Sequence, residues 1–172
     1  MVIVNRDMSS QELLARYAAG ERDFRGLELP RMGLVKVDLR GINLAGSNLY
    51  ASSFRGSDLS DAILKGTNIS SCSFDQANLS KADIRYARAH VTAFWEADLT
   101  LTNFSYATLE NAMFENTELG RTNLEYTILI GANFKGATRD GKVMGFFEPN
   151  QAFLYNTVKP DGELFVGPYP DD

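Results

Sequence analysis

The side chains best suited to catalysis are few in this chain and lie apart from one another. Among 172 residues there is one histidine, His90, and one cysteine, Cys72. A Ser or Cys nucleophile needs a base beside it, and no residue pattern pairs one with His90. No glycine-rich phosphate-binding motif occurs, and one Cys with one His excludes a disulfide framework, an Fe–S cluster or a Cys/His zinc site within one chain. We therefore expect no enzymatic activity, no cofactor, a surface position for His90 and a small-hydrophobe role for Cys72.

Carboxylates are the other reactive group, and four of them recur at a fixed spacing. Asp38, Asp58, Asp98 and Glu118 stand at multiples of twenty residues from one another, with Asn78 between them. Like charges stacked at this spacing repel one another and could hold a cation weakly. The alternative is that each carboxylate accepts a hydrogen bond within its own turn. We favour the second interpretation and expect no metal site.

The elements that position these side chains follow a period of five residues. Stepping by five from Phe24 to Phe134 visits Leu, Ile or Phe at every position except Ala89. Two residues before each of these centres stands Ala, Ser, Thr or Cys throughout Ser47–Ala132, and Asp or Asn recurs directly before the centre. This period matches neither the 3.6 residues of a helix nor the alternation of a strand. The chain must therefore turn a corner every five residues.

A second period, of twenty residues, sets the number of sides. One series of centres at this spacing consists of Phe: Phe54, Phe74, Phe94, Phe114 and Phe134. The centres between them form Leu and Ile series at the same spacing. Four pentapeptides per coil place like residues on like, with coils stacked about 4.8 Å apart. The centres and the small residues before them point inward. The pattern predicts a square, parallel, all-β solenoid of nearly six coils.

The repeated unit also carries a family resemblance. Runs such as Ala77–Lys81, Ala82–Tyr86 and Ala97–Leu101 resemble the A(D/N)LXX unit of pentapeptide repeat proteins, over residues 22–135. The resemblance implies a right-handed quadrilateral parallel β-helix, usually without enzymatic activity, and many members of the family are cyanobacterial. Residues 12–24 are similar to the start of cyanobacterial members, and residues 156–162 resemble their common C-terminal ending.

We expect a single domain, residues 1–172, with both ends of the solenoid covered. Ser9 and Glu12 form a capping-box pattern and Gly20 a stop signal, which predicts an N-terminal capping helix over residues 9–20. The β-helix follows over residues 22–135. Larger residues stand at the small-residue position of the first coil, where they would fill a wider, capped end: Leu27, Met32, Val37 and Ile42.

Residues 136–172 are expected to form an irregular C-terminal cap. Lys159–Gly162 predicts a turn between two short extended pieces, and Ala152 and Leu154 fall back in frame, twenty residues beyond Ala132 and Phe134. The segment is rich in apolar side chains: Met144, Phe146, Phe147, Phe153, Leu154, Tyr155, Leu164, Phe165, Val166 and Tyr169. So much apolar area at one end indicates either a folded lid alone or a lid that also forms a homodimer contact.

The most informative surface feature is a file of tyrosines two residues after the centre of one side. Tyr86, Tyr106 and Tyr126 succeed Gly26, Gly46 and Gly66 at this position. On the next side we expect outward-facing neighbours: Arg88, His90, Val91, Ile128 and Ile130. These tyrosines, with Ile128 and Ile130 beside them, indicate a protein contact, and the alternative is that the rings only stiffen the corner. Trp95, on a different side, is a second and weaker candidate.

Charge and hydropathy limit the other partners. The net charge of −5 disfavours direct binding to nucleic acid or to an anionic membrane. No apolar run approaches the roughly 18 residues of a membrane span, and the first residues lack the pattern of a signal peptide, so we expect a cytoplasmic protein.

We expect a non-catalytic interaction or regulatory scaffold that binds a protein partner. The resemblance offers one alternative, because some family members imitate duplex DNA and act as inhibitors or protectors of DNA gyrase. Outward positions of residues 23–135 carry 13 acidic and 11 basic side chains, so dense carboxylate rows are lacking over most of the rod. The acidic excess is confined to the stretch after His90.

Overall fold

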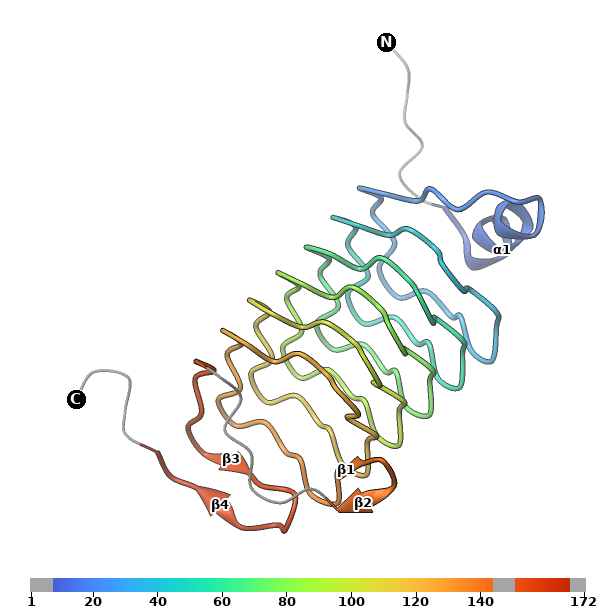
Figure 1. Ribbon diagram of the computed structural model, residues 1–172. Coiled ribbons are helices and arrows are strands. Elements are labelled where there is room, and N and C mark those ends of the chain that lie inside the picture. The colour runs from blue at the N-terminus through green and yellow to red at the C-terminus, as the bar shows by residue number, and fades with distance from the viewer. Residues whose placement is uncertain (1–7, 144–150, 168–172) are drawn as a thin grey trace.

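A computed structural model describes residues 8–143 and 151–167, and in it the backbone winds into a stack of coils (Figure 1). Parallel bridges join residues twenty apart along each side, beginning with Asp23 to Asn43 and Glu28 to Asn48. The centres from Phe24 to Leu119 donate their N–H groups to the following coil, as Phe74 does to the carbonyl of Ala93 at 2.8 Å. The twenty-residue period and the all-β solenoid are confirmed.

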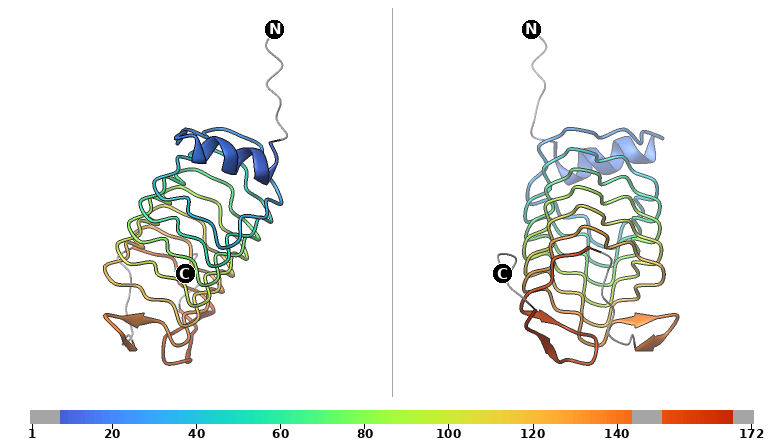
Figure 2. Two further views of the ribbon diagram at one scale, coloured as in Figure 1. Left: turned by 90° about the vertical axis from the view of Figure 1, so that its right-hand side faces the viewer. Right: turned by 60° about the vertical axis from the view of Figure 1, so that its left-hand side comes forward.

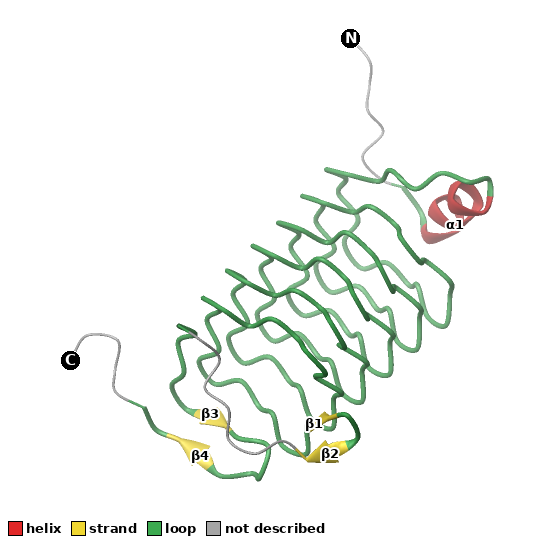
Figure 3. Cartoon of the chain, in the orientation of Figure 1, coloured by secondary structure: helices red, strands yellow, loops and turns green. Residues whose placement is uncertain are grey.

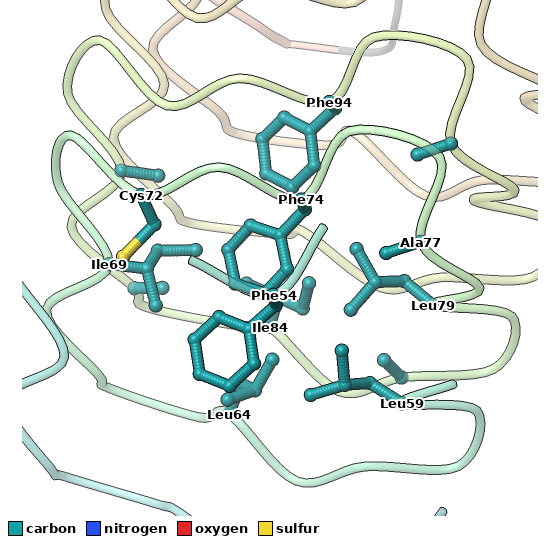
Figure 4. Packing of buried hydrophobic residues seen from close by; sticks show 14 of the residues in the cluster. Phe54, Leu59, Leu64, Ile69, Cys72, Phe74, Ala77, Leu79, Ile84 and Phe94 are labelled. Atoms are coloured by element: carbon teal, nitrogen blue, oxygen red, sulfur yellow. The ribbon is translucent and has the colours of Figure 1, made fainter. Parts of the chain in front are cut away.

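The interior is filled by the centres, which stack on their counterparts in neighbouring coils (Figure 4). Ring centroids of Phe54 and Phe74 lie 5.0 Å apart and those of Phe74 and Phe94 lie 5.5 Å apart, with nearly parallel planes. Phe114 and Phe134 continue the stack at 5.0 and 4.6 Å. Because each ring covers the next, these side chains are almost wholly removed from water, and the predicted inward side is confirmed.

The small residue two before the centre is also buried throughout Ser47–Thr117, and its hydroxyl or thiol is satisfied by the backbone. Thr92 Oγ1 donates to the carbonyl of Ile69 at 2.9 Å, and Cys72 Sγ donates to that of Leu49 at 2.9 Å. Burial raises the pKa of the Cys72 thiol to about 12, against a smaller lowering by backbone hydrogen bonds. Cys72 is therefore a neutral, inward-facing side chain, as expected.

Every corner is a tight turn with one left-handed residue. The residue two after the centre has a positive φ, 60° at Gln76 for example, and the amide of Ala77 donates back to the carbonyl of Phe74 at 3.0 Å. This combination is a type II β-turn. Some corners use glycine, as at Gly66, but others force side chains into this conformation, including the β-branched Val91 at 54°. The five-residue pattern predicts a corner without predicting the turn type.

A helix lies beside the first coils (Figures 1 and 3). Helix α1 spans Ser10–Ala18, and the Ser9 hydroxyl at its N-terminus accepts a hydrogen bond from the amide of Glu12 at 3.1 Å. Its Leu13 is fully buried in the core, and the Tyr17 hydroxyl donates to the carbonyl of Arg40 at 2.9 Å. The larger side chains of the first coil all pack into or against the core: Leu27, Met32, Val37 and Ile42.

Two antiparallel strand pairs follow the regular coils (Figure 2). Strands β1 (Thr138–Arg139) and β2 (Lys142–Val143) form a hairpin whose two loop residues, Asp140 and Gly141, both have positive φ. Such a loop is a type I′ turn, for which Asp-Gly is a preferred sequence. Strands β3 (Thr157–Val158) and β4 (Leu164–Phe165) flank the Lys159–Gly162 turn, which confirms that prediction.

Glu118 holds the loop of the first hairpin. Its carboxylate accepts hydrogen bonds from the amides of Asp140 and Gly141, at 2.9 and 3.1 Å, and from the Thr138 hydroxyl at 2.8 Å. Partial burial acts to raise the pKa of Glu118, but these hydrogen bonds outweigh it and lower the pKa below its ordinary value.

The hairpin also shifts the frame of the last coil. Beyond it, Phe153 bridges Ile128 and Val158 bridges Asn133, a separation of 25 residues. The prediction that Ala152 and Leu154 stack on Ala132 and Phe134 is therefore wrong: Leu154 follows Leu129, because the chain from Thr138 to Phe153, which begins with this hairpin, is five residues longer than the twenty-residue period allows. Of the apolar residues named for this segment, several lie outside the described part of the chain: Met144, Phe146, Phe147 and Tyr169.

Candidate functional site

Three tyrosines stack along one corner of the solenoid, and we call them the tyrosine ladder: Tyr86, Tyr106 and Tyr126. The first two ring centroids are 5.1 Å apart with planes inclined by 8°, and the last two are 4.8 Å apart with planes inclined by 4°. The three residues remain 52%, 49% and 43% exposed. The three tyrosines therefore lie in one row, as predicted. Their rings stack on one another, and about half of each residue's surface still faces water.

The ladder exists because of the backbone at this corner. Its residues occupy the left-handed turn position, with φ of 59°, 63° and 57°, so all three side chains leave the corner in the same direction. Gly46 and Gly66 occupy the same position in earlier coils, and hence no side chain extends the ladder toward the N-terminus. Lys65 lies at that end, with its Nζ 5.6 Å from the Tyr86 ring centroid, which places a cation over the first ring.

An apolar rim continues the ladder on the next side of the solenoid, formed by Ile128, Ile130 and Phe153. Ile128 and Ile130 are half-buried and face outward, as expected. The bridge between Ile128 and Phe153 brings Phe153, 53% exposed, beside them from the last coil. Sequence reasoning missed Phe153 because it assumed a twenty-residue frame. The Asp-Gly pair at 140–141 was the signal that could have revealed the five extra residues.

The other residues expected near the ladder are exposed and do not form a catalytic group. Arg88, His90 and Val91 all face solvent. The Nδ1 atom of His90 lies 3.6 Å from a carboxylate oxygen of Glu110, and both side chains are largely in water. Among the described residues, no hydrogen bond joins the His90 imidazole to a hydroxyl or thiol, which is the pairing that a nucleophile and its base form.

Three of the four spaced carboxylates form local turn contacts. Oδ1 of Asp58 accepts from the amide of Ser60, and Oδ1 of Asp98 from that of Thr100, each at 2.9 Å. Asp38 does the same with Arg40, whose guanidinium lowers the pKa of this carboxyl to about 2. The local interpretation is thus confirmed for these three, whereas Glu118 accepts hydrogen bonds from the hairpin of the next coil. Within the residues described, no three His, Cys, Asp or Glu side chains are grouped so as to hold a metal ion.

A search for membrane-spanning helices over the described ranges gave no segment with the length and hydrophobicity that crossing a bilayer requires.

Comparison with known families gives two overlapping matches. A model described as pentapeptide repeats (8 copies) matches residues 34–70, and one described as pentapeptide repeat region matches residues 67–142. No curated protein matches the chain.

Several solved structures are similar to it. HetL, a pentapeptide repeat protein involved in heterocyst differentiation regulation in Nostoc sp. strain PCC 7120, is 21% identical, with 92% of this chain and 100% of HetL covered and a TM-score of 0.32. QnrB1, a plasmid-mediated fluoroquinolone resistance protein, is 21% identical over 78% of this chain and 75% of its own, with a TM-score of 0.42. A pentapeptide repeat protein of the Arabidopsis thaliana thylakoid lumen is 29% identical over 64% of this chain and 70% of its own, with a TM-score of 0.32.

Proposed function

Because the chain belongs to the pentapeptide repeat family, we propose that it is a non-catalytic scaffold that binds a protein partner through the tyrosine ladder and its apolar rim. The observation that carries the proposal is the exposure of three stacked rings, each about half open to water, next to Ile128 and Phe153. Exposed aromatic side chains beside apolar ones are the usual anchors of protein interfaces.

Rigidity favours such a role for the ladder. The amides of Tyr86 and Tyr106 donate to the next coil, to the carbonyls of Ser105 and Glu125 at 3.2 and 3.1 Å, which fixes both turns. Stacking further restricts the rings before any partner arrives, so little side-chain entropy is lost on binding. Phenolic hydroxyls at the outer edge can also donate and accept hydrogen bonds. The partner surface that fits is a flat strip of apolar groups with polar groups at its margin.

The test is affinity capture from the native extract with the full-length chain and two variants. We expect the double variant Tyr106→Ala, Tyr126→Ala to lose the partner that the unaltered chain retains. Tyr50→Ala is the matched control, because Tyr50 is also 43% exposed but lies outside the ladder. Circular dichroism establishes that each variant is folded. If all three chains recovered the same proteins, the ladder would not be a binding surface, and its rings would only stiffen the corner.

The fold suggests a finer arrangement as part of the same proposal. We propose a right-handed, single-domain rod of about six coils, whose N-terminal end is capped by residues 9–20 and whose C-terminal end is capped by residues 136–172. Open ends of a solenoid invite end-to-end association, and α1 lies where it would block one end. Limited proteolysis tests this: one protected core including both ends is expected, and early loss of either cap would contradict it.

A homodimer through the C-terminal cap is a further part of the proposal. Its support is the exposure of Leu164 and Val166, 54% and 69%, on and beside strand β4. We expect sedimentation equilibrium to give a dimer that Leu164→Lys with Val166→Lys converts to monomer. A monomeric unaltered chain at micromolar concentration would leave the cap as a lid alone.

We do not favour the gyrase-directed DNA mimic, because several carboxylates are neutralised within their own turns. Asp23, Asp38 and Asp83 pair with the arginines two residues later, at 2.7, 2.6 and 2.7 Å: Arg25, Arg40 and Arg85. These turns offer no free negative charge to imitate a phosphate row. We expect no inhibition of supercoiling by purified gyrase, and inhibition at micromolar protein would restore this alternative.

A further inference from the structure

A hollow of about 520 Å³ lies on the solenoid about half a coil away from the tyrosine ladder. Trp95, Glu115 and Lys135 line it and follow one another at twenty-residue intervals, so they come from three consecutive coils. The rest of the lining comes from the turns beside them and from the last coil: Asn116, Gly136, Pro160 and Asp161. Trp95 is 40% exposed. The hollow thus combines an accessible aromatic face with charged side chains.

Glu115 is the unusual member of this lining. Its Oε1 accepts a hydrogen bond from Nδ2 of Asn133 at 2.7 Å, whereas its Oε2 is buried with no hydrogen-bond partner among the described residues. Within those same residues, no basic side chain pairs with Glu115. A buried carboxylate oxygen without a donor is unfavourable, and a donor that reaches it contributes more than it would in water.

The other carboxylate of the lining, Asp161, is already engaged. Asp161 lies 3.6 Å from the ammonium of Lys159 and accepts a hydrogen bond from the amide of Glu163 at 2.9 Å. The aliphatic part of the Lys135 side chain lies beside Gly162. A β-carbon added to Gly162 would be 3.8–3.9 Å from the Cγ, Cδ and Cε atoms of Lys135. Of the two carboxylates in this lining, Glu115 is consequently the one that a cationic ligand can still satisfy.

We propose that this hollow binds an arginine side chain presented by a peptide or protein. A guanidinium is planar and stacks on an indole face, and its N–H groups are the donors that a carboxylate oxygen accepts best. Trp95 would provide the stacking face and Glu115 the acceptor. Because Oε2 is buried, the side chains around it must shift before a guanidinium can reach it, and Trp95 lines the same hollow. Occupancy therefore changes the environment of the indole.

Trp95 is the one tryptophan of the chain, so its fluorescence reports on this hollow directly. The full-length protein is titrated with the peptide Gly-Ser-Arg-Ser-Gly, with the same peptide carrying citrulline in place of arginine, and with agmatine. Citrulline keeps the shape of the side chain but lacks its charge. We expect a saturable change with the arginine peptide and about tenfold weaker binding of the citrulline peptide. Equal binding of both peptides, or no saturable change, would overturn the proposal.

Variants assign the binding to Glu115. Glu115→Gln retains an oxygen for Asn133 and is expected to stay folded while binding the arginine peptide about tenfold more weakly. Glu110→Gln is the matched control, because Glu110 occupies the same turn position on another side and should leave binding unchanged. Equal affinity of the two variants would exclude Glu115 as the acceptor. Agmatine binding more tightly than the peptide would contradict a peptide-borne arginine. All these outcomes are independent of the tyrosine ladder, which Tyr106→Ala probes separately.

Discussion

The molecule contains two aromatic ladders with the same twenty-residue spacing and nearly the same stacking geometry. In the inner ladder, Phe94 and Phe114 stack at 5.0 Å, and in the outer one Tyr106 and Tyr126 stack at 4.8 Å. Their surroundings differ entirely: the phenylalanines are fully buried, whereas the tyrosines are nearly half exposed. Spacing is a property of the coil, but the energetic role of a ring depends on what else touches it.

The inner ladder has additional partners that the outer ladder lacks. Phe104 meets Phe94 edge-on at 5.6 Å and Phe114 edge-on at 6.1 Å, so rings pack across the interior as well as along it. The tyrosines have ring contacts with one another and a cation at one end. We therefore assign the inner ladder to stability and the outer ladder to recognition, and variants at equivalent places separate the two.

The largest expected effect is at the centre of the inner ladder. Phe94→Ala removes a ring that contacts Phe74, Phe104 and Phe114, and should lower the free energy of unfolding by about 3–5 kcal/mol. Urea unfolding followed by circular dichroism measures it. Phe94→Leu keeps most of the apolar volume and should cost clearly less. Equal losses in the two variants would show that volume in the interior is not what stabilises the stack.

The pH dependence of the free energy of unfolding tests how well the interior around Cys72 is closed to water. The pKa of Cys72 is raised to about 12 in the folded chain by burial, above the roughly 8.5 of an exposed thiol, so the unfolded state ionises first. The stability that Cys72 contributes is complete below the unfolded pKa and is lost as pH rises toward the folded pKa. We expect a loss of about 1.4 kcal/mol per pH unit above pH 9, measured against Cys72→Ala to cancel other titrating groups. Parallel pH profiles of the two chains would mean that the thiol reaches solvent.

At the outer ladder, the same truncation should have a small effect on folding. Tyr106→Ala removes two stacking contacts but less buried area than Phe94→Ala does, and should lower the free energy of unfolding by about 1 kcal/mol. Urea unfolding under the conditions used for Phe94→Ala gives the direct comparison. A loss as large as that of Phe94→Ala would make the tyrosines structural and would remove the basis for a recognition role.

Much of this arrangement follows from the sequence, because the solenoid interior repeats a narrow choice of residues. The period of five identifies Phe74 and Phe94 as inward, and the period of twenty stacks them. The turn type does not follow, since the left-handed position tolerates Gly, Gln or Val when the amide of that residue donates to a carbonyl of the next coil. The last coil does not follow either, because one Asp-Gly hairpin at residues 140–141 changes its length.

The candidate site was predictable in part for the same reason. Tyr86, Tyr106 and Tyr126 share a register that the repeat fixes, so their stacking follows from counting. Phe153 reaches Ile128 only through the lengthened coil. The hollow at Trp95 was missed because Glu115 and Asp161 meet there from segments whose distance depends on that same insertion. No sequence period encodes an unpartnered carboxylate oxygen.

Val91 tests how much strain the corners hold outside the two ladders. Its φ of 54° is costly for a β-branched residue, and its side chain is 41% exposed, so little packing is lost when it is removed. We expect Val91→Gly to raise the free energy of unfolding by about 0.5–1 kcal/mol. Gly33 is outside the left-handed region, so Gly33→Ala is the reference for exchanging glycine and a residue with a β-carbon where no left-handed strain changes. A destabilised Val91→Gly would mean that the valine side chain contributes packing at this corner.

The smallest effect is expected from the surface charge of Asp38. Its pKa is lowered to about 2, first by the side-chain hydrogen bonds of Arg40 and then by that residue's amide. A lowered folded pKa means that the contribution to stability is present above the unfolded value, near 3.9, and disappears as pH falls toward 2. Both side chains are more than half exposed, so solvent and salt screen the pair and the effect on unfolding at neutral pH should be close to zero.

In an NMR titration, Arg40→Ala should move the Asp38 midpoint upward, whereas Arg88→Ala should leave it in place. If Arg40→Ala instead unfolded the chain at neutral pH, charges at the corners would rival the inner ladder in importance, and the division between a buried stabilising region and an exposed recognition region would fail.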